Sequence, residues 1–158
     1  MTWRGSATPA DRIFAALPYL LPLIEGLIFG QFLFAQFPQL ALIFLPLFPL
    51  LQLYASIPLA GLIIFFALFF LVVRNENISH FIRFNTMQAI LIDILLSITR
   101  LIVQLSGSAL SSGFLAETLF NVIFLGVFAA CAYSIVQSLL GRYAEIPTLS
   151  EAVHMQVR

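Results

Sequence analysis

Four apolar stretches of membrane-spanning length constrain the fold of this chain more than any other feature of its sequence. They cover residues 13–34, 57–73, 84–105 and 114–140. A helix needs about 20 largely apolar residues to cross the hydrocarbon core of a bilayer, and core strands of soluble proteins are much shorter. Of the 158 residues, 61% are hydrophobic and 9% are charged. The sequence therefore predicts an all-α, polytopic integral membrane protein, a single domain (1–158) built as a bundle of four transmembrane helices.

Residues 37–53, between the first two spans, are apolar but contain Pro38, Pro46 and Pro49. Proline removes a backbone donor and clashes with the preceding helical turn, so an uninterrupted helix is not expected there. We predict a short helical segment that is interfacial or re-entrant. Residues 141–158 are predicted to form a short C-terminal tail.

The arginines favour four spans over five. With four spans, the arginines of the termini and of the loop between the second and third spans share one side of the membrane; these are Arg4, Arg12, Arg74, Arg83, Arg142 and Arg158. Short cytoplasmic loops carry an excess of basic residues. Both termini are therefore predicted to be cytoplasmic or, in a plastid, stromal.

Several classes of function are disfavoured by the residues that the chain lacks. There is no lysine for Schiff-base chemistry, and the single cysteine, Cys131, allows no internal disulfide. His80 and His154 lack metal-ligand spacing, and no glycine-rich phosphate loop is present. The net charge is zero, without the basic stripe that nucleic-acid binding requires. We predict neither an enzyme nor a protein that binds a metal, cofactor or nucleic acid.

The third span carries polar residues that a simple anchor would not need. Arg83, Asn85, Gln88 and Asp93 lie within residues 80–97, and Asp93 falls near the membrane midplane. A stripe on one face of this helix contains Thr86, Asp93, Ser97, Arg100 and Gln104. Polar groups in hydrocarbon are costly and face protein or water. Either a buried structural contact or a polar, proton-sensitive lining satisfies this pattern.

The hairpin between the third and fourth spans suggests a partner for Arg100. A turn at 106–113 would bring Arg100 level with Glu117 and Asn121, and we predict an Arg100–Glu117 ion pair. Gly126 would lie at about the level of Asp93, where a small residue permits close helix packing.

The first span contains a second intramembrane acid, Glu25, followed by Gly26 and Gly30 in a GxxxG pattern. Such glycines let helices approach closely, within one chain or between chains. Glu25 could meet Asp93 across the bundle if one of the two is protonated. Pro18 and Pro22 are expected to bend this helix.

The N-terminal residues indicate a helix start and no targeting segment. Thr8 can cap the first helix, with Pro9 at its first position and Asp11 completing a capping box. The apolar run that follows lacks the features of a removable signal, and no transit segment is recognised. We expect a bacterial or organelle-encoded chain, or a mature form that has been trimmed.

The chain contains VVRN followed by HFIRFNTMQA, together with ADRIFAALPYLLPLIEGLIFG, FPLLQLYASIP and IPTLSEAVHMQV. In these motifs the sequence resembles the Tic20 family of membrane components of the protein import translocon at the chloroplast inner envelope, with cyanobacterial relatives. The matching positions are Arg74, Asn75, His80, Arg83, Phe84, Asn85, Met87, Gln88 and Asp93. The resemblance implies four transmembrane helices and a role in moving or assembling proteins, with other translocon subunits and transiting polypeptides as partners.

Function is thus expected to be that of a membrane subunit of a protein translocation complex. Four packed helices fill their own centre, so a protein-conducting channel would need an oligomer or other subunits. The alternatives are a small-solute or ion carrier that uses Asp93 and Glu25, and a non-conducting assembly scaffold. The membrane is expected to be a cyanobacterial plasma or thylakoid membrane or the chloroplast inner envelope.

Overall fold

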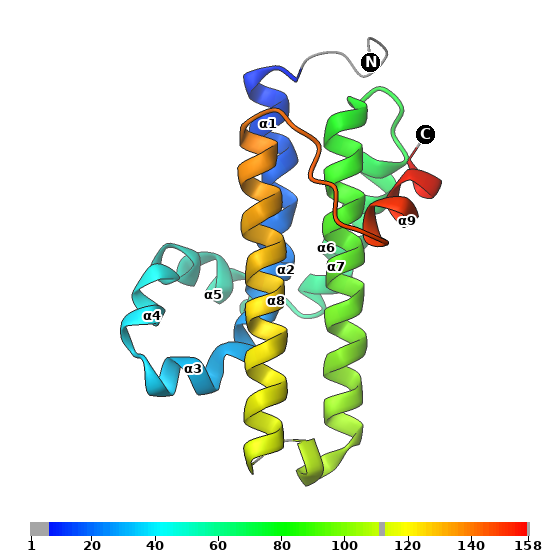
Figure 1. Cartoon of the computed structure of the whole chain (residues 1–158). Helices are drawn as coiled ribbons and strands as arrows, with labels where there is room; N and C mark the ends of the chain where they lie inside the picture. The colour runs from blue at the N-terminus through cyan, green and yellow to red at the C-terminus, as the bar shows by residue number, and fades with distance from the viewer. Residues whose placement is uncertain (1–6, 111–112, 158) are drawn as a thin grey trace.

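The computed structural model describes residues 7–110 and 113–157, and within these ranges it is helical without strands. The α-helices are α1 (Pro9–Ala16), α2 (Leu20–Gly26), α3 (Gln31–Gln36), α4 (Gln39–Ile43), α5 (Phe48–Ser56), α6 (Ala60–Leu68), α7 (His80–Leu105), α8 (Gly113–Leu139) and α9 (Leu149–Gln156). Three uprights, α1–α2, α7 and α8, stand side by side with α6 behind α7 (Figure 1). The predicted all-α polytopic architecture is confirmed.

The first upright belongs to one helical run, Pro9–Gln36, which is interrupted by tighter turns and ends in α3. Thr8 caps it as predicted: its hydroxyl accepts from the Asp11 amide at 3.1 Å, and the Asp11 carboxylate accepts from the Thr8 amide at 3.1 Å. A 3₁₀ turn at Leu17–Tyr19 contains Pro18, which lacks the amide that a regular turn would use.

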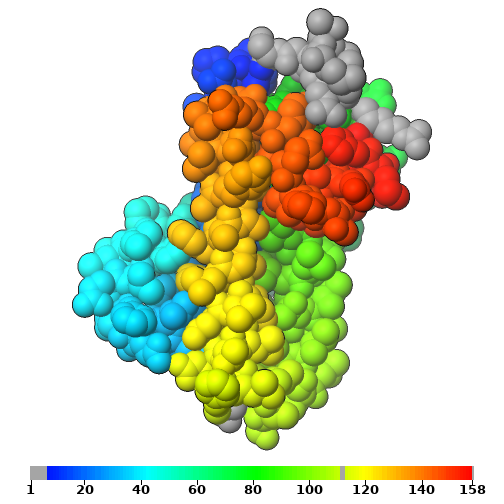
Figure 2. All heavy atoms as spheres, in the orientation of Figure 1, coloured from blue at the N-terminus to red at the C-terminus, as the bar shows by residue number. Residues whose placement is uncertain are grey.

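The proline-bearing segment forms a lobe, which we define as residues 31–56, beside the bundle. It contains α3, α4, a 3₁₀ turn at Leu45–Leu47 and α5. The lobe projects sideways from the uprights (Figures 1 and 2, cyan). Several of its large hydrophobic side chains are exposed, among them Leu42, Ile43 and Leu53. The helical run that ends the lobe meets the run Ala60–Val73 at 101°, through a turn in which Leu59 has φ 58°. Short helices and a sharp bend agree with the predicted re-entrant segment.

The second predicted span is shorter than the sequence suggested. It begins at Ala60 and continues into a π-helical turn, Phe69–Val73. The first upright, α7 and α8 are each long and apolar enough to cross a membrane, and the bent pair of runs supplies a fourth span if it is counted as one. Two crossings out and two back put the start of α1, the start of α7 and the end of α8 at the same end of the bundle, here called the terminal end (Figure 1).

Buried side chains fill the centre of the bundle in three clusters among the described residues. The first joins α6, α7 and the C-terminal segment, the second joins α2–α4 to α7 and α8, and the third packs Tyr19 against α7 and α8. Phenylalanine rings in the second cluster pack edge to face; the ring centroids of Phe29 and Phe120, for example, are 5.2 Å apart. Side chains of the described residues therefore pack the centre of one copy.

The C-terminal residues form a docked helix where the sequence suggested only a tail. Val153 of α9 and Val157 just beyond it are buried against Phe84, Met87 and Ile90 of α7. Figure 2 shows this segment (red) lying against the terminal end of the bundle, on the side away from the lobe.

Candidate functional site

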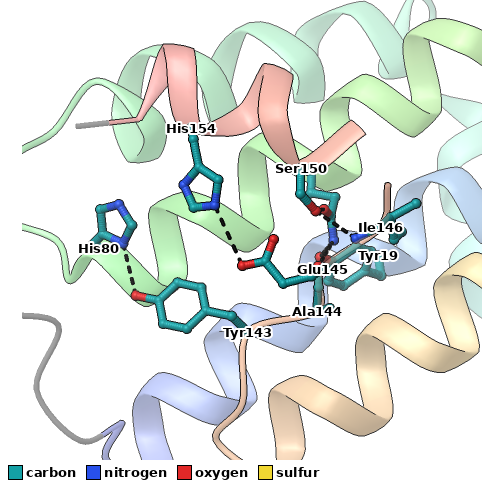
Figure 3. Close-up of polar contacts among 9 residues, drawn as sticks. Tyr19, His80, Tyr143, Ala144, Glu145, Ile146, Ser150 and His154 are labelled. Atoms are coloured by element: carbon teal, nitrogen blue, oxygen red, sulfur yellow. Dashed lines mark hydrogen bonds and ion pairs between the residues drawn. The ribbon is translucent and has the colours of Figure 1, made fainter. Parts of the chain in front are cut away.

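Gln88, in the third turn of α7, is the centre of a buried hydrogen-bond network at the terminal end. Its Nε2 donates to the Tyr19 hydroxyl at 3.0 Å and to the Ala144 carbonyl at 2.9 Å. Its Oε1 accepts from the Ser150 hydroxyl at 3.0 Å, and Ser150 accepts in turn from the Ile146 amide at 2.6 Å. Figure 3 shows these groups converging from the first upright and the C-terminal segment. The side chain of Gln88 thus forms hydrogen bonds to three separate segments of the chain.

Asn85, one turn earlier on α7, extends this network to α8. Its Oδ1 accepts from the Tyr19 hydroxyl at 2.7 Å and from the Ser138 hydroxyl at 3.1 Å, and its Nδ2 donates to the Phe81 carbonyl at 2.9 Å. Both Asn85 and Gln88 are fully buried. Hydrocarbon offers no competing hydrogen-bond partners. The hydrogen bonds of Asn85 and Gln88 therefore fix how the helices that they join pack against one another.

Local contacts hold the start of α7 in place for this network. The Ser79 hydroxyl caps the helix by accepting from the Ile82 amide at 3.4 Å. Buried Arg83 donates its Nε–H to the Val73 carbonyl at 2.9 Å, which ties α7 to the end of the second span. His80 contacts the Tyr143 hydroxyl at 2.8 Å, and His154 of α9 lies 3.6 Å from Glu145 (Figure 3).

A second polar group lies further along α7, at the middle of that helix. Asp93 is 13 residues along α7 from His80, about 20 Å at the helical rise, and it is buried. Its carboxyl group interacts with that of Glu25 on α2, and the Tyr54 hydroxyl of α5 donates to Glu25 Oε1. Asp93 Oδ1 has no hydrogen-bond partner among the described residues. Glu25 and Asp93 are thus neighbours across the bundle, and Tyr54 attaches the lobe to Glu25.

A cavity of about 380 Å³ adjoins this second group, between α2, the lobe and α7. Glu25, Tyr54 and Arg100 line it together with apolar residues of the lobe. Within residues 7–110 and 113–157, no three His, Cys, Asp or Glu side chains are grouped so that they could hold a metal ion.

The predicted Arg100–Glu117 ion pair is wrong. Glu117 Oε1 instead accepts from Gln36 Nε2 at 2.9 Å, and Arg100 lines the cavity beside Glu25. The two residues lie at similar levels, but Arg100 is on the face of α7 turned toward α2 and α5, whereas Glu117 is on the face of α8 turned toward α3. Asn121 is part-buried, and its side-chain oxygen has no partner among the described residues.

The polar stripe of α7 divides into two parts. Thr86 and Asp93 are buried, whereas Ser97, Arg100 and Gln104 are exposed. The cluster that joins α6 to α7 extends no further along α7 than Ile94. Because the second span is short, the polar residues beyond that point stay uncovered within this chain.

The three glycines singled out in the sequence differ in their surroundings. A Cβ atom at Gly26 would lie 3.1 Å from Val127, and one at Gly30 would lie 2.9 Å from ring atoms of Phe34 and Phe124. These two glycines therefore bring α2 and α3 close to α8 within the chain. A Cβ atom at Gly126 would meet nothing within 4 Å, so a helix contact there stays a prediction and would need another molecule.

The partners that complete both polar groups were not predicted from the sequence. Tyr19 and Tyr54 were overlooked because a tyrosine in an apolar helix gives no sign of where its hydroxyl points. Ser150 could have been found, because Leu149, Val153 and Val157 recur at a spacing of four and indicate an amphipathic helix.

The family's sequence model, described as "Chloroplast import apparatus Tic20-like", matches residues 9–153. The chain belongs to the Tic20 family. A Tic20 family protein of Synechocystis sp. is 55% identical over 100% of this chain and 99% of the relative. Protein TIC 20-II, chloroplastic, of Arabidopsis thaliana is 37% identical over 99% of this chain and 78% of its own length.

Plastid-encoded relatives match as well. The Tic20 family protein Ycf60 of Porphyra purpurea is 35% identical over 92% of this chain and 75% of its own length. The Tic20 match spans all the uprights, the lobe and most of α9, so both polar groups lie inside the matched region. With its apolar helices, this chain is an integral membrane protein of a family whose description names the chloroplast import apparatus.

Proposed function

We propose that this chain is a membrane subunit of a protein translocation complex and contributes one wall of the path taken by the transiting polypeptide. Membership of a family described as chloroplast import apparatus supports the first part. The observation that supports the second is the pair of exposed polar side chains Ser97 and Gln104 on α7, with exposed Arg100 beside them at the cavity. An extended polypeptide in transit carries polar groups that need such partners away from bulk water.

One copy of the chain would form only part of the proposed path. The core clusters fill the centre of this bundle, so a polypeptide cannot pass through a single copy. Further copies or other membrane subunits facing Ser97 and Gln104 would complete the path. The chain is therefore proposed to work in an oligomer or hetero-complex.

The terminal end is proposed to face the cytoplasm, or the stroma in a plastid. Arg12, Arg74, Arg83 and Arg142 lie near the ends of the uprights that meet there, whereas Arg100 lies in the opposite half of α7. This distribution follows the positive-inside rule. A cyanobacterial plasma or thylakoid membrane, or the chloroplast inner envelope, fits that orientation.

Photocrosslinking in native membranes tests the proposed wall. A photoreactive amino acid at Ser97 or Gln104 is expected to capture several unrelated preproteins arrested in transit by a folded C-terminal domain. The same probe at Leu125, on the outer face of α8, is the control and is expected to capture few. Capture of only one or two fixed membrane proteins would contradict the proposal and indicate an assembly scaffold.

A carrier of small solutes or ions is the second candidate, because Glu25 and Asp93 interact near mid-membrane beside a cavity. Under this proposal, liposomes with the purified chain would pass protons, detected by an enclosed pH-sensitive dye. Asp93→Asn would abolish that flux, because an amide cannot exchange a proton with Glu25, whereas exposed Ser97→Ala would leave it unchanged. Equal fluxes in liposomes with and without protein would exclude this candidate.

A further inference from the structure

An apolar groove of about 640 Å³ runs along the outside of the bundle, between α1–α2 and α5–α6. Leu53, Ile57 and Ile63 form its lip and are 59%, 44% and 56% exposed, so the groove opens sideways toward the surrounding bilayer. The groove is a different hollow from the cavity beside Glu25, and Ile24 and Tyr54 lie between the two.

The length of the groove matches one leaflet. Phe14 lines it near the terminal end and Ile24 lines it near mid-membrane. Ten residues of helix span about 15 Å. Half of a hydrocarbon core of about 30 Å is also about 15 Å. The groove therefore has the reach of one lipid acyl chain and not that of a membrane-spanning helix.

One buried polar atom borders the groove without a partner. Thr86 lies in its lining with 0% exposure, and its Oγ1 makes no hydrogen bond to any described residue. A threonine within a helix can satisfy its hydroxyl on the carbonyl four residues earlier. Here that bond is not made, so the hydroxyl is available to a molecule in the groove.

The depth of Thr86 indicates which group that molecule presents. Thr86 is six residues along α7 from His80, about 9 Å at the helical rise. The polar interface of a bilayer is about 5–8 Å thick on each side, so Thr86 lies near the boundary where the glycerol ester carbonyls of a lipid begin.

A positive charge stands beyond the same end of the groove. Val72 and Ile78 line that end, and exposed Arg74 lies in the loop between them, with its guanidinium 6.0 Å from the centre of the Phe69 ring. Arginine suits a phosphate group through its planar set of donors. Arg74, Thr86 and the apolar groove thus suit the phosphate, an ester carbonyl and an acyl chain, in the order in which a phospholipid carries these groups.

We propose that the groove holds one phospholipid of the leaflet at the terminal end, with an acyl chain between α2 and α5–α6 and an ester carbonyl that accepts from Thr86. The bound acyl chain would contact both the lobe and the first upright, on the side where the second span begins. Neither the translocation role nor the carrier role is needed for this site.

Native mass spectrometry of the full chain, purified from membranes and then exposed to phosphatidylglycerol, tests the proposal. The unaltered chain is expected to retain roughly one phospholipid per molecule after collisional release of the detergent. Ile63→Trp fills the lip of the groove and is expected to lose it, whereas Leu125→Trp, the same kind of change on the exposed face of α8, is expected to keep it. Thr86→Val is expected to release the lipid about fivefold faster, as for one lost hydrogen bond.

Leu53→Trp, from the opposite side of the lip, repeats the test if Ile63→Trp lowers the melting temperature more than Leu125→Trp does. Equal lipid retention in a lip variant and in Leu125→Trp would overturn the proposal. So would a photocrosslinker at Leu53 that captures a polypeptide in place of lipid in the purified chain.

Discussion

Replacing Gln88 by methionine is expected to destabilise the bundle and to loosen α9. The change keeps the length of the side chain but removes the bonds to the Tyr19 hydroxyl, the Ala144 carbonyl and the Ser150 hydroxyl. At about 0.6–2 kcal/mol for each of the three hydrogen bonds, the loss in unfolding free energy is about 2–6 kcal/mol. The melting temperature falls, and the amides of Leu149–Gln156 exchange faster with deuterium.

Gln104→Met is the matched control. It makes the same chemical change on the same helix, but Gln104 is exposed and its side chain forms no hydrogen bond with any described residue. Its melting temperature and α9 exchange are expected to stay close to those of the unaltered chain. If the two variants lose stability equally, the network does not hold the C-terminal segment.

The second large effect is expected at Gly30. A valine there puts side-chain atoms where ring atoms of Phe34 and Phe124 already lie, 2.9 Å from the first carbon added. Phe124 is buried among other rings and has little room to move. Overpacking of this kind costs about 1–3 kcal/mol, so the free energy of unfolding in detergent falls by that amount.

Gly126→Val serves as the comparison, because the added atoms meet open space. Within one chain its stability is expected to be unchanged or slightly higher, since valine is the better helix former. In native membranes the same variant reports on a partner: smaller complexes on blue native gels would show that another helix packs at Gly126. A Gly30→Val chain as stable as Gly126→Val would contradict the packing described here.

Hydropathy and helix caps in the sequence predict much of this fold. They say little about which faces of neighbouring helices contact one another. The number of spans follows from the lengths of the apolar runs, and the capping box at Thr8 follows from residues three apart. The start of α6 at Ala60 could not be read, because the apolar composition continues unbroken from the lobe into the span. The direction in which Arg100 points could not be read either, since helical spacing gives level along the axis but not the rotation of one helix against its neighbour.

The candidate polar residues were visible, but their pairing was not. Asn85, Gln88, Asp93 and Glu25 stand out because polar groups are rare in apolar helices. The three partners of Gln88 lie 69, 56 and 62 residues away, and the one 56 residues away is a backbone carbonyl, which no residue type indicates. The extended loop 140–148 brings that carbonyl into place, and its course depends on the docking of α9.

The short second span has a consequence for the lipids around it. Its nine α-helical residues and the π-helical turn of five reach about 21 Å, against about 30 Å of hydrocarbon. A span that falls short thins the bilayer beside it, at a fraction of a kcal/mol for each Å of mismatch. The hydrocarbon core of the bilayer is therefore expected to be thinner next to α6 than beside the longer helices α7 and α8.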